Sequence, residues 1–189
     1  MKHRYHHGNL KDAVLAIARA ELREAPHAPL SLRDLARKLG VSATAPYRHF
    51  PGKDGVTVAL AAEGYRELTL LSETAAAGPR PAQALAAGYS RFAESEPALL
   101  GLLNSADLSG LDPASDVVLA RDEWFASLVG VVEAAAGKLP ADEAYRRAAQ
   151  IWAALLGVTQ LTRHGARGLL LDELLPDVAR LVQKTALGR

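Results

Sequence analysis

The side chains with the clearest chemistry in this sequence lie between Ser31 and Lys53, in the stretch SLRDLARKLGVSATAPYRHFPGK. Hydroxyl and imidazole groups follow one another here at Thr44, Tyr47 and His49, and an ammonium group comes just after them. Such groups donate hydrogen bonds to phosphate oxygens, while small residues beside them allow a close approach to base edges. The segment therefore predicts non-covalent binding of DNA rather than bond-breaking chemistry.

A short helix and a tight turn must position these side chains. Ser31 and Asp34 have the spacing of a capping box, which predicts that a helix begins here and covers residues 32–39. Gly40 can adopt the left-handed conformation that ends a helix, because it has no Cβ to clash. Ala36 is small enough for a following segment to cross the helix closely.

A third, very short helix is predicted from Ser42 or Thr44 to about His49, with Pro46 confined to its opening turn. Such a helix would project from the surface and enter a major groove, which is about 12 Å wide. Phe50 is predicted to be a core residue that anchors this helix. The candidate DNA contacts are Arg33, Ser42, Ala43, Thr44, Ala45, Tyr47, Arg48, His49 and Lys53.

Charge is distributed unevenly along the chain. Residues 1–54 carry ten Lys/Arg, five Asp/Glu and five of the six histidines, whereas residues 55–189 carry twelve Lys/Arg and sixteen Asp/Glu. A basic end on a faintly acidic body is suited to a polyanionic partner. Lys53 lies at the start of a predicted long helix, whose free N–H groups would complete an anion site.

The N-terminal tail is also basic and can be interpreted in two ways. It could be an arm that reaches a phosphate or the minor groove of DNA, or it could be a frayed terminus. A metal site built from its histidines is disfavoured because no rigid scaffold holds them, and we expect neither a metal nor a cofactor. The residues concerned are Lys2, His3, Arg4, Tyr5, His6 and His7.

The whole-chain composition excludes several classes. The 189 residues are 49% hydrophobic, enough to bury a sizeable core, and include no cysteine, which excludes disulfides, thiolate metal sites and a cysteine nucleophile. The polar N-terminus lacks the apolar core of a signal peptide, and no apolar run of about 18 residues indicates a membrane span. The expected location is therefore the cytoplasm, without membrane association.

Apolar spacing predicts an all-α fold of about nine helices and no strands. Proline and glycine separate most of the helices. The predicted ranges are Leu10–Leu22, Leu32–Leu39, Ser42–His49, Lys53–Ala77, Pro81–Glu94, Pro97–Ser105, Ala114–Lys138, Ala141–His164 and Asp172–Ala186.

The ordered elements Leu-x-x-Leu-Ala, Gly-Val-Ser and Tyr-x-His-Phe-x-x-Lys, together with the opening YHHGNLKDAVLAIA, resemble the TetR family of transcriptional regulators. The resemblance implies an all-α homodimer. A helix-turn-helix DNA-binding domain would cover residues 1–52, and a ligand-binding and dimerisation domain would cover residues 53–189. By this resemblance Thr44, Tyr47, His49 and Lys53 match positions that usually face DNA, and Gly40, Val41 and Phe50 match structural positions.

The sequence departs from the family pattern in two places. Gly55-Val56 stands where an alanine followed by leucine is more usual; a glycine inside a helix costs about 1 kcal/mol and would make the helix easier to bend. The stretch Ile151–Gly157 resembles the tryptophan-histidine-glycine signature of one C-terminal subgroup. It has Trp152 and the glycine, but Leu156 replaces the histidine.

Two sets of residues in the C-terminal part are candidates for binding roles, although either set could simply fill the core. The first would form a dimer face from the last two helices and comprises Leu155, Val158, Leu161, Leu174, Leu175, Val178, Leu181 and Val182. The second would line a pocket for a small apolar or amphipathic effector and comprises Tyr89, Phe92, Leu100, Leu103, Asn104, Trp124, Leu128 and Trp152.

The leading functional hypothesis is a ligand-responsive repressor that binds a near-palindromic, double-stranded DNA operator as a dimer and is released by an effector. One alternative is a helical enzyme, but the sequence has no Gly-x-Ser-x-Gly elbow, His-Glu-x-x-His, phosphate loop or dinucleotide fingerprint. The other alternative is a protein-binding adaptor whose head has lost DNA binding, against which the basic N-terminal part argues.

Overall fold

The computed structural model describes residues 10–25, 28–51, 54–105, 110–163 and 180–188, and these residues are helical with connecting turns and contain no strand. A further helical segment, 180–187, follows the named elements. The named elements are α1 (Leu10–Glu24), α2 (Leu32–Leu39), the 3₁₀ helix η1 (Pro46–Arg48), α3 (Gly55–Ala76), α4 (Pro81–Ser95), α5 (Pro97–Ser105), α6 (Asp116–Ala136) and α7 (Ala141–Arg163).

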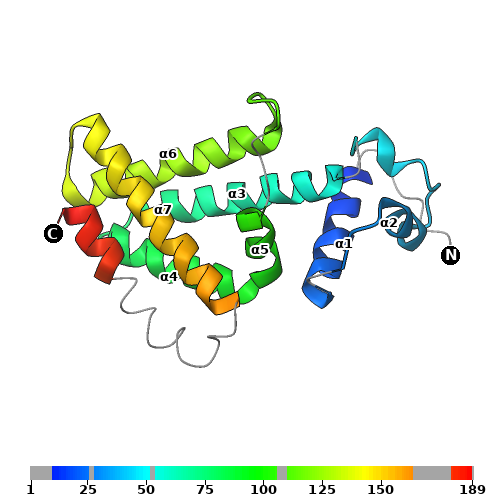
Figure 1. Ribbon diagram of the computed structural model, residues 1–189, viewed down its shortest axis with the longest axis horizontal. Helices are drawn as coiled ribbons and strands as arrows, with labels where there is room; N and C mark the ends of the chain where they lie inside the picture. Colours follow the sequence, from blue (N-terminus) through cyan, green and yellow to red (C-terminus); the bar gives the residue numbers. More distant parts are fainter. Residues whose placement is uncertain (1–9, 26–27, 52–53, 106–109, 164–179, 189) are drawn as a thin grey trace.

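The helices form two groups along an elongated molecule (Figure 1). We call α1, α2 and η1 the head, and α3 to α7 with segment 180–187 the body. The long helix α3 runs from the head into the body, where it packs most extensively against α6. Segment 180–187 lies at the end of the body that is remote from the head.

One continuous apolar core connects the head to the body. In the head, the periodic residues Val14, Ala18 and Leu22 of α1 are buried, as the spacing predicts. Phe50, only 1% exposed, belongs to the same cluster as Val56 at the start of α3. The core position predicted for Phe50 is therefore confirmed.

Local signals determine both ends of α2, as predicted. The Ser31 hydroxyl accepts a hydrogen bond from the Asp34 N–H at 3.3 Å, which caps the first turn. Gly40 adopts the left-handed conformation, with φ 68°, and its N–H donates to the Arg37 carbonyl at 3.1 Å. The next N–H, of Val41, donates to the Ala36 carbonyl at 3.1 Å, which completes a Schellman motif.

The predicted very short helix is present, with Pro46 in its opening turn, but it is shorter than predicted and lacks the predicted side-chain cap. The chain forms a turn followed by the three-residue 3₁₀ helix η1, and no side chain caps it. In an α-helix the Ser42 carbonyl would accept from the N–H of residue 46, but Pro46 has none. The Ser42 carbonyl accepts instead from the Ala45 N–H at 3.0 Å, one residue earlier. The tighter 3₁₀ geometry follows from this shift.

The predicted long helix begins later than expected, because α3 starts at Gly55. Gly55 is thus the first residue of the helix, so the cost predicted for an interior glycine does not apply. A Cβ at this position would lie 2.9 Å from the carbonyl carbon of Phe50 and 3.1 Å from its Cα. Real Cβ contacts are essentially never that short, so glycine allows the head to approach α3.

The remaining helices begin and end close to their predicted boundaries. Proline opens α4 and α5 at their first residues, where its missing N–H costs little. The start of the last predicted helix lies outside the described residues, and its end lies in segment 180–187. Within the described ranges, no helix has both the length and the apolar character needed to cross a membrane.

Candidate DNA-binding site

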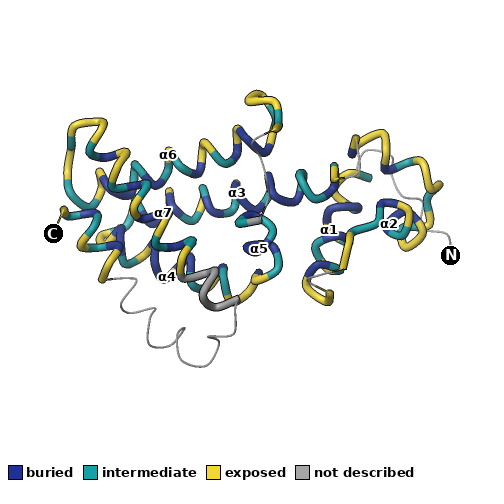
Figure 2. Tube along the Cα trace, viewed as in Figure 1, coloured by how far each residue is buried: buried dark blue, intermediate teal, exposed yellow. Residues whose placement is uncertain are grey.

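The predicted DNA contacts lie on the outer surface of the head. The side chains of Ser42, Ala43 and Thr44 are exposed in the turn after α2, and Ala45 is partly buried. Figure 2 shows exposed residues along most of this connection between α2 and α3. Arg33, on the first turn of α2, is also exposed, whereas Lys53 lies outside the described residues.

Buried residues on either side hold η1 in place. Pro46 is buried at its start and Phe50 just after its end, so the three residues between them point outwards. Tyr47 is 53% exposed although it is a large aromatic residue. The His49 ring packs edge-on against Phe50, with 6.5 Å between ring centroids. The two buried residues thus anchor a short segment that exposes the hydroxyl of Tyr47, the guanidinium of Arg48 and the imidazole of His49.

The two arginines near this surface are available for anions. Among the described residues, neither Arg33 nor Arg48 forms an ion pair, whereas Arg37 pairs with Asp34 at 2.8 Å. Lys38 is likewise engaged, because its ammonium group lies 2.8 Å from the Glu21 carboxylate of α1. The hydrogen bond to Glu21 raises the pKa of Lys38. Arg33 and Arg48 therefore fit phosphate contacts better than Arg37 or Lys38 does.

The turn before η1 combines small size with hydrogen-bonding capacity. The hydroxyl oxygens of Ser42 and Thr44 lie 3.4 Å apart, and both side chains are exposed. Short side chains let a backbone approach the floor of a groove, and a hydroxyl can donate to or accept from base edges and phosphates. The chemistry of this turn is therefore suited to contacts with DNA.

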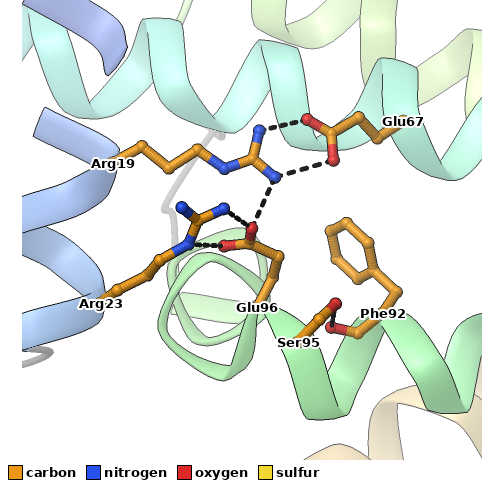
Figure 3. Close-up of polar contacts among 6 residues, drawn as sticks. All are labelled: Arg19, Arg23, Glu67, Phe92, Ser95 and Glu96. Carbon is orange, nitrogen blue, oxygen red and sulfur yellow. Dashed lines mark hydrogen bonds and ion pairs between the residues drawn. The ribbon is translucent and has the colours of Figure 1, made fainter. Parts of the chain in front are cut away.

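An ion cluster that the sequence analysis did not predict joins the head to the body (Figure 3). Arg19 of α1 donates to both carboxylate oxygens of Glu67 on α3, one of them at 2.9 Å, and lies 3.0 Å from Glu96. Arg23 also binds Glu96 through two nitrogens, with the Nε contact at 3.1 Å. A possible signal was the i, i+4 spacing of the two arginines, which places both on one face of α1.

Glu96 carries a charge although it is only 6% exposed. Burial on its own would raise the pKa of Glu96, but the hydrogen bonds from Arg23 and Arg19 outweigh it and lower the pKa. The hydrogen bond to Glu67 is the main cause that raises the pKa of Arg19. Arg19, Arg23 and Glu96 are therefore charged at neutral pH.

The predicted pocket residues lie within the body core. Five of them, Leu100, Leu103, Trp124, Leu128 and Tyr89, are at most 5% exposed, and Phe92 is 8% exposed. The Trp124 ring lies between those of Tyr65, tilted at 5.7 Å, and Trp152, edge-to-face at 5.4 Å, measured between ring centroids. The Asn104 Nδ2 is buried without a hydrogen-bond partner among the described residues. Tyr65, Trp124 and Trp152 thus form an aromatic layer in the body, and Asn104 adds a buried donor without a partner in the described part of the chain.

Among the surface clefts lined by described residues, two that were not predicted contain none of the eight predicted pocket residues. One, of about 470 Å³, lies between α3 and α4 and is lined by residues such as Leu70 and Arg91. The other, of about 460 Å³, lies where the head meets α3 and α6 and is lined by residues such as His49, Gly55 and Leu111.

The predicted dimer residues separate into different environments. Leu155 and Val182 are at most 1% exposed and fill the core of their own chain. Leu181 is 49% exposed and remains available to a second copy. The side chains of the others are outside the described part of the chain: Val158, Leu161, Leu174, Leu175 and Val178.

The predicted N-terminal arm, with its histidines, lies in residues 1–9 and is outside the described residues. Among the residues that the structure does describe, no group of three or more His, Asp or Glu side chains could hold a metal ion.

Comparison with known proteins gives two family matches. Residues 14–60 match the family described as bacterial regulatory proteins of the tetR family, and residues 82–184 match the tetracyclin repressor-like C-terminal domain. No functionally curated protein matches the chain.

Solved structures resemble the chain over most of its length. A protein of unknown function from Rhodococcus sp. RHA1 is 33% identical, with a TM-score of 0.76, and the match covers 97% of this chain and 98% of that one. The TetR family transcriptional regulator PfmR from Thermus thermophilus is 16% identical, with a TM-score of 0.65 and coverage of 90% and 97%, and shows the shared fold.

The two family matches lie in the expected order and together span the head and most of the body. Regulators of this family bind DNA and act as dimers. The resemblance noted in the sequence is therefore confirmed: the chain belongs to the TetR family of DNA-binding transcriptional regulators.

Proposed function

We propose that this protein is a ligand-responsive repressor. Residues 1–52 act as the DNA-binding domain, and residues 53–189 bind the effector and the second copy. Two copies would place their Ser42–His49 segments about 34–36 Å apart on successive turns of a near-palindromic operator. One observation carries the proposal: exposed hydroxyl and guanidinium groups on η1, and the imidazole group of His49 directly after it, lie between two buried anchors, Pro46 and Phe50.

Selection of bound sequences from a random duplex pool tests this proposal. Two symmetrically disposed segments should enrich a palindrome with half-sites one helical turn apart. Recovery of sequences without a common motif, from a preparation shown to be dimeric, would contradict specific operator binding. A consensus without two-fold symmetry would contradict the proposed dimeric arrangement on DNA.

Replacement of Lys53 by glutamine should weaken binding to every DNA sequence by a similar factor. Loss of one phosphate contact removes about one counterion released on binding, so the slope of log K against log salt should fall by about one unit. The measurement is a mobility-shift titration at several salt concentrations. Lys138→Gln, which removes one exposed charge beyond α6, is the matched control. An unchanged slope in Lys53→Gln argues against the phosphate contact.

Replacement of Tyr47 by phenylalanine should reduce DNA affinity by about tenfold, because a hydrogen bond to a charged phosphate contributes about 1.5 kcal/mol or more. The hydroxyl belongs to a side chain that is 53% exposed, so the fold should be unaffected. Tyr145→Phe removes the hydroxyl of a tyrosine that is 61% exposed on α7 and should bind DNA normally. Fluorescence anisotropy with labelled operator compares the two variants; equal affinities would contradict the role of Tyr47.

The effector is proposed to bind in the aromatic layer of the body. A buried donor without a partner costs about 1–3 kcal/mol, so an effector that offers an acceptor to Asn104 would recover part of this cost. The surroundings are apolar and aromatic, which favours an amphipathic molecule with one hydrogen-bond acceptor. An effector can release DNA only to the extent that it binds the DNA-incompetent state more tightly.

Intrinsic fluorescence offers a direct test of the effector site. The chain has two tryptophans, Trp124 and Trp152, and both lie in the aromatic layer. A bound amphiphile that reaches this layer should change the tryptophan emission and should lower DNA affinity in the same concentration range. A panel of small amphiphilic acids, amides and alcohols is titrated against the wild type and against Asn104→Leu, in which the response should be weakened. A compound that releases DNA without changing the emission would place the effector elsewhere.

A further inference from the structure

The contact between the head and the body has two different parts. The apolar part consists of Phe50 against the start of α3, where Gly55 allows backbone contact. The polar part is the ion cluster of Arg19, Arg23, Glu67 and Glu96. Its hydrogen bonds join residues that are separated by 48 and by 73 positions in the sequence. The apolar contact is close to the chain connection and can act as a pivot. The ion cluster contacts α1 at Arg19 and Arg23, in the second half of that helix (Figure 3).

Glu96 stands at a junction within the body. Its N–H donates to the Phe92 carbonyl at 2.8 Å, and its own carbonyl accepts from the Leu100 N–H at 2.9 Å. It therefore ends α4 and precedes α5, which begins at Pro97. Its carboxylate extends to α1 and binds both arginines (Figure 3). The α4–α5 junction is thus fastened directly to the first helix of the head.

Glu67 completes the cluster from α3. Because Arg19 donates to Glu67 and also contacts Glu96, one guanidinium connects α1 to two separate elements of the body. Three attachment points restrict rotation of α1 far more than a single exposed pair would. Exposed pairs contribute little, but Glu96 is 6% exposed, and a buried charge left without a partner is strongly unfavourable.

We propose that Glu96 is a positioning residue for DNA binding: through Arg19 and Arg23 it holds the head at the one angle to the body that fits DNA. This inference rests on the proposed function, because it concerns how the same DNA-binding surface is aimed. A dimer must present two segments at a fixed separation, so a head that rotates freely is competent for only part of the time. Apparent affinity falls in proportion to that competent fraction.

The role of Glu96 can be tested by measuring the angle of the head and the affinity for DNA on the same variants. The chain has no cysteine, so a pair of spin labels can be introduced at Arg37→Cys on α2 and Ala134→Cys on α6, both exposed positions. Labelled protein is diluted with unlabelled protein so that distances within one chain dominate. In Glu96→Gln, the distance distribution should broaden, and affinity for the selected operator should fall about tenfold or more.

Two further variants make the result interpretable. Arg23→Gln removes a partner whose side chain is 53% exposed, so it should fold even if Glu96→Gln does not, and it should also broaden the distances. Glu143→Gln breaks an arginine–glutamate pair that lies within α7, and both the distances and the affinity should stay at wild-type values. Circular dichroism at the working temperature verifies that each variant is folded.

The outcomes separate this inference from the proposed function. Unchanged distance distributions in Glu96→Gln and Arg23→Gln would overturn the positioning role. Broadened distances with unchanged operator affinity would also overturn it, because the angle would then not matter for DNA. A wild type that binds no DNA would refute the proposed function. The positioning role for DNA would then be overturned with it, while the distances would still show whether Glu96 holds the head.

Discussion

Replacement of Phe50 by alanine is expected to lower the free energy of unfolding by about 3–5 kcal/mol, the cost of truncating a buried phenylalanine. Phe50 is 1% exposed and belongs to the core cluster that includes residues of both α1 and α3. The cavity would open directly under η1, which carries Tyr47 and Arg48. DNA affinity should therefore fall together with stability, even at temperatures where the variant is still folded.

Urea denaturation followed by circular dichroism measures the loss of stability, and anisotropy with labelled operator measures the loss of affinity. Leu85→Ala is the matched control, because Leu85 is also 1% exposed but lies on α4 in the body. The free energy of unfolding of Leu85→Ala should fall by a comparable amount, about 2–5 kcal/mol. The folded variant should nevertheless bind DNA with nearly wild-type affinity. Equal losses of affinity in both variants would mean that Phe50 has no specific role in supporting η1.

Replacement of Gly55 by alanine should lower stability by about 1–3 kcal/mol, the usual cost of forcing an extra carbon into a packed contact. The added Cβ would lie 2.9 Å from the Phe50 carbonyl carbon, and backbone cannot move aside as a flexible side chain can. The first turn of α3 and the head must therefore separate. Because this contact is close to η1, DNA affinity should fall as well.

Gly130 provides the opposite case. It lies inside α6, and a Cβ there would meet nothing within 4 Å. Gly130→Ala should therefore stabilise the protein by about 0.5–1 kcal/mol, since alanine loses less conformational entropy in a helix. Paired denaturation curves compare the two substitutions. The explanation of Gly55 fails if Gly55→Ala stabilises the protein as Gly130→Ala does.

The helix over 32–39 was predictable because its signals are local. Ser31, Asp34 and Gly40 act within one or two turns, and their hydrogen bonds form wherever this stretch of chain goes. The same holds for the prolines that open α4 and α5. The burial of Phe50 was predictable from its apolar character next to exposed polar residues.

The shortness of η1 also has a local cause, which the sequence contained. Pro46 removes the N–H that an α-helix from Ser42 would need, and the chain responds with the tighter turn. Pro46 was predicted to fit the opening turn, where it does lie, at the loss of at most one backbone hydrogen bond. The prediction did not ask which donor the Ser42 carbonyl would bind once Pro46 offers no N–H. Hydrogen-bond accounting at Ser42 would have indicated the 3₁₀ geometry.

The sequence by itself determined the helical class, the ends of α2 and the family, because capping residues, glycine turns and ordered motifs depend on neighbours a few residues away. Only the tertiary structure decided that Arg19 and Arg23 meet Glu67 and Glu96, and that Gly55 lies against Phe50. The spacing of the two arginines places them on one face of α1, but no spacing in the chain identifies their partners. The ion cluster depends on how helices distant in sequence cross, and the packing of the whole core determines those crossing angles. The Gly55 contact depends on how closely the head approaches the start of α3.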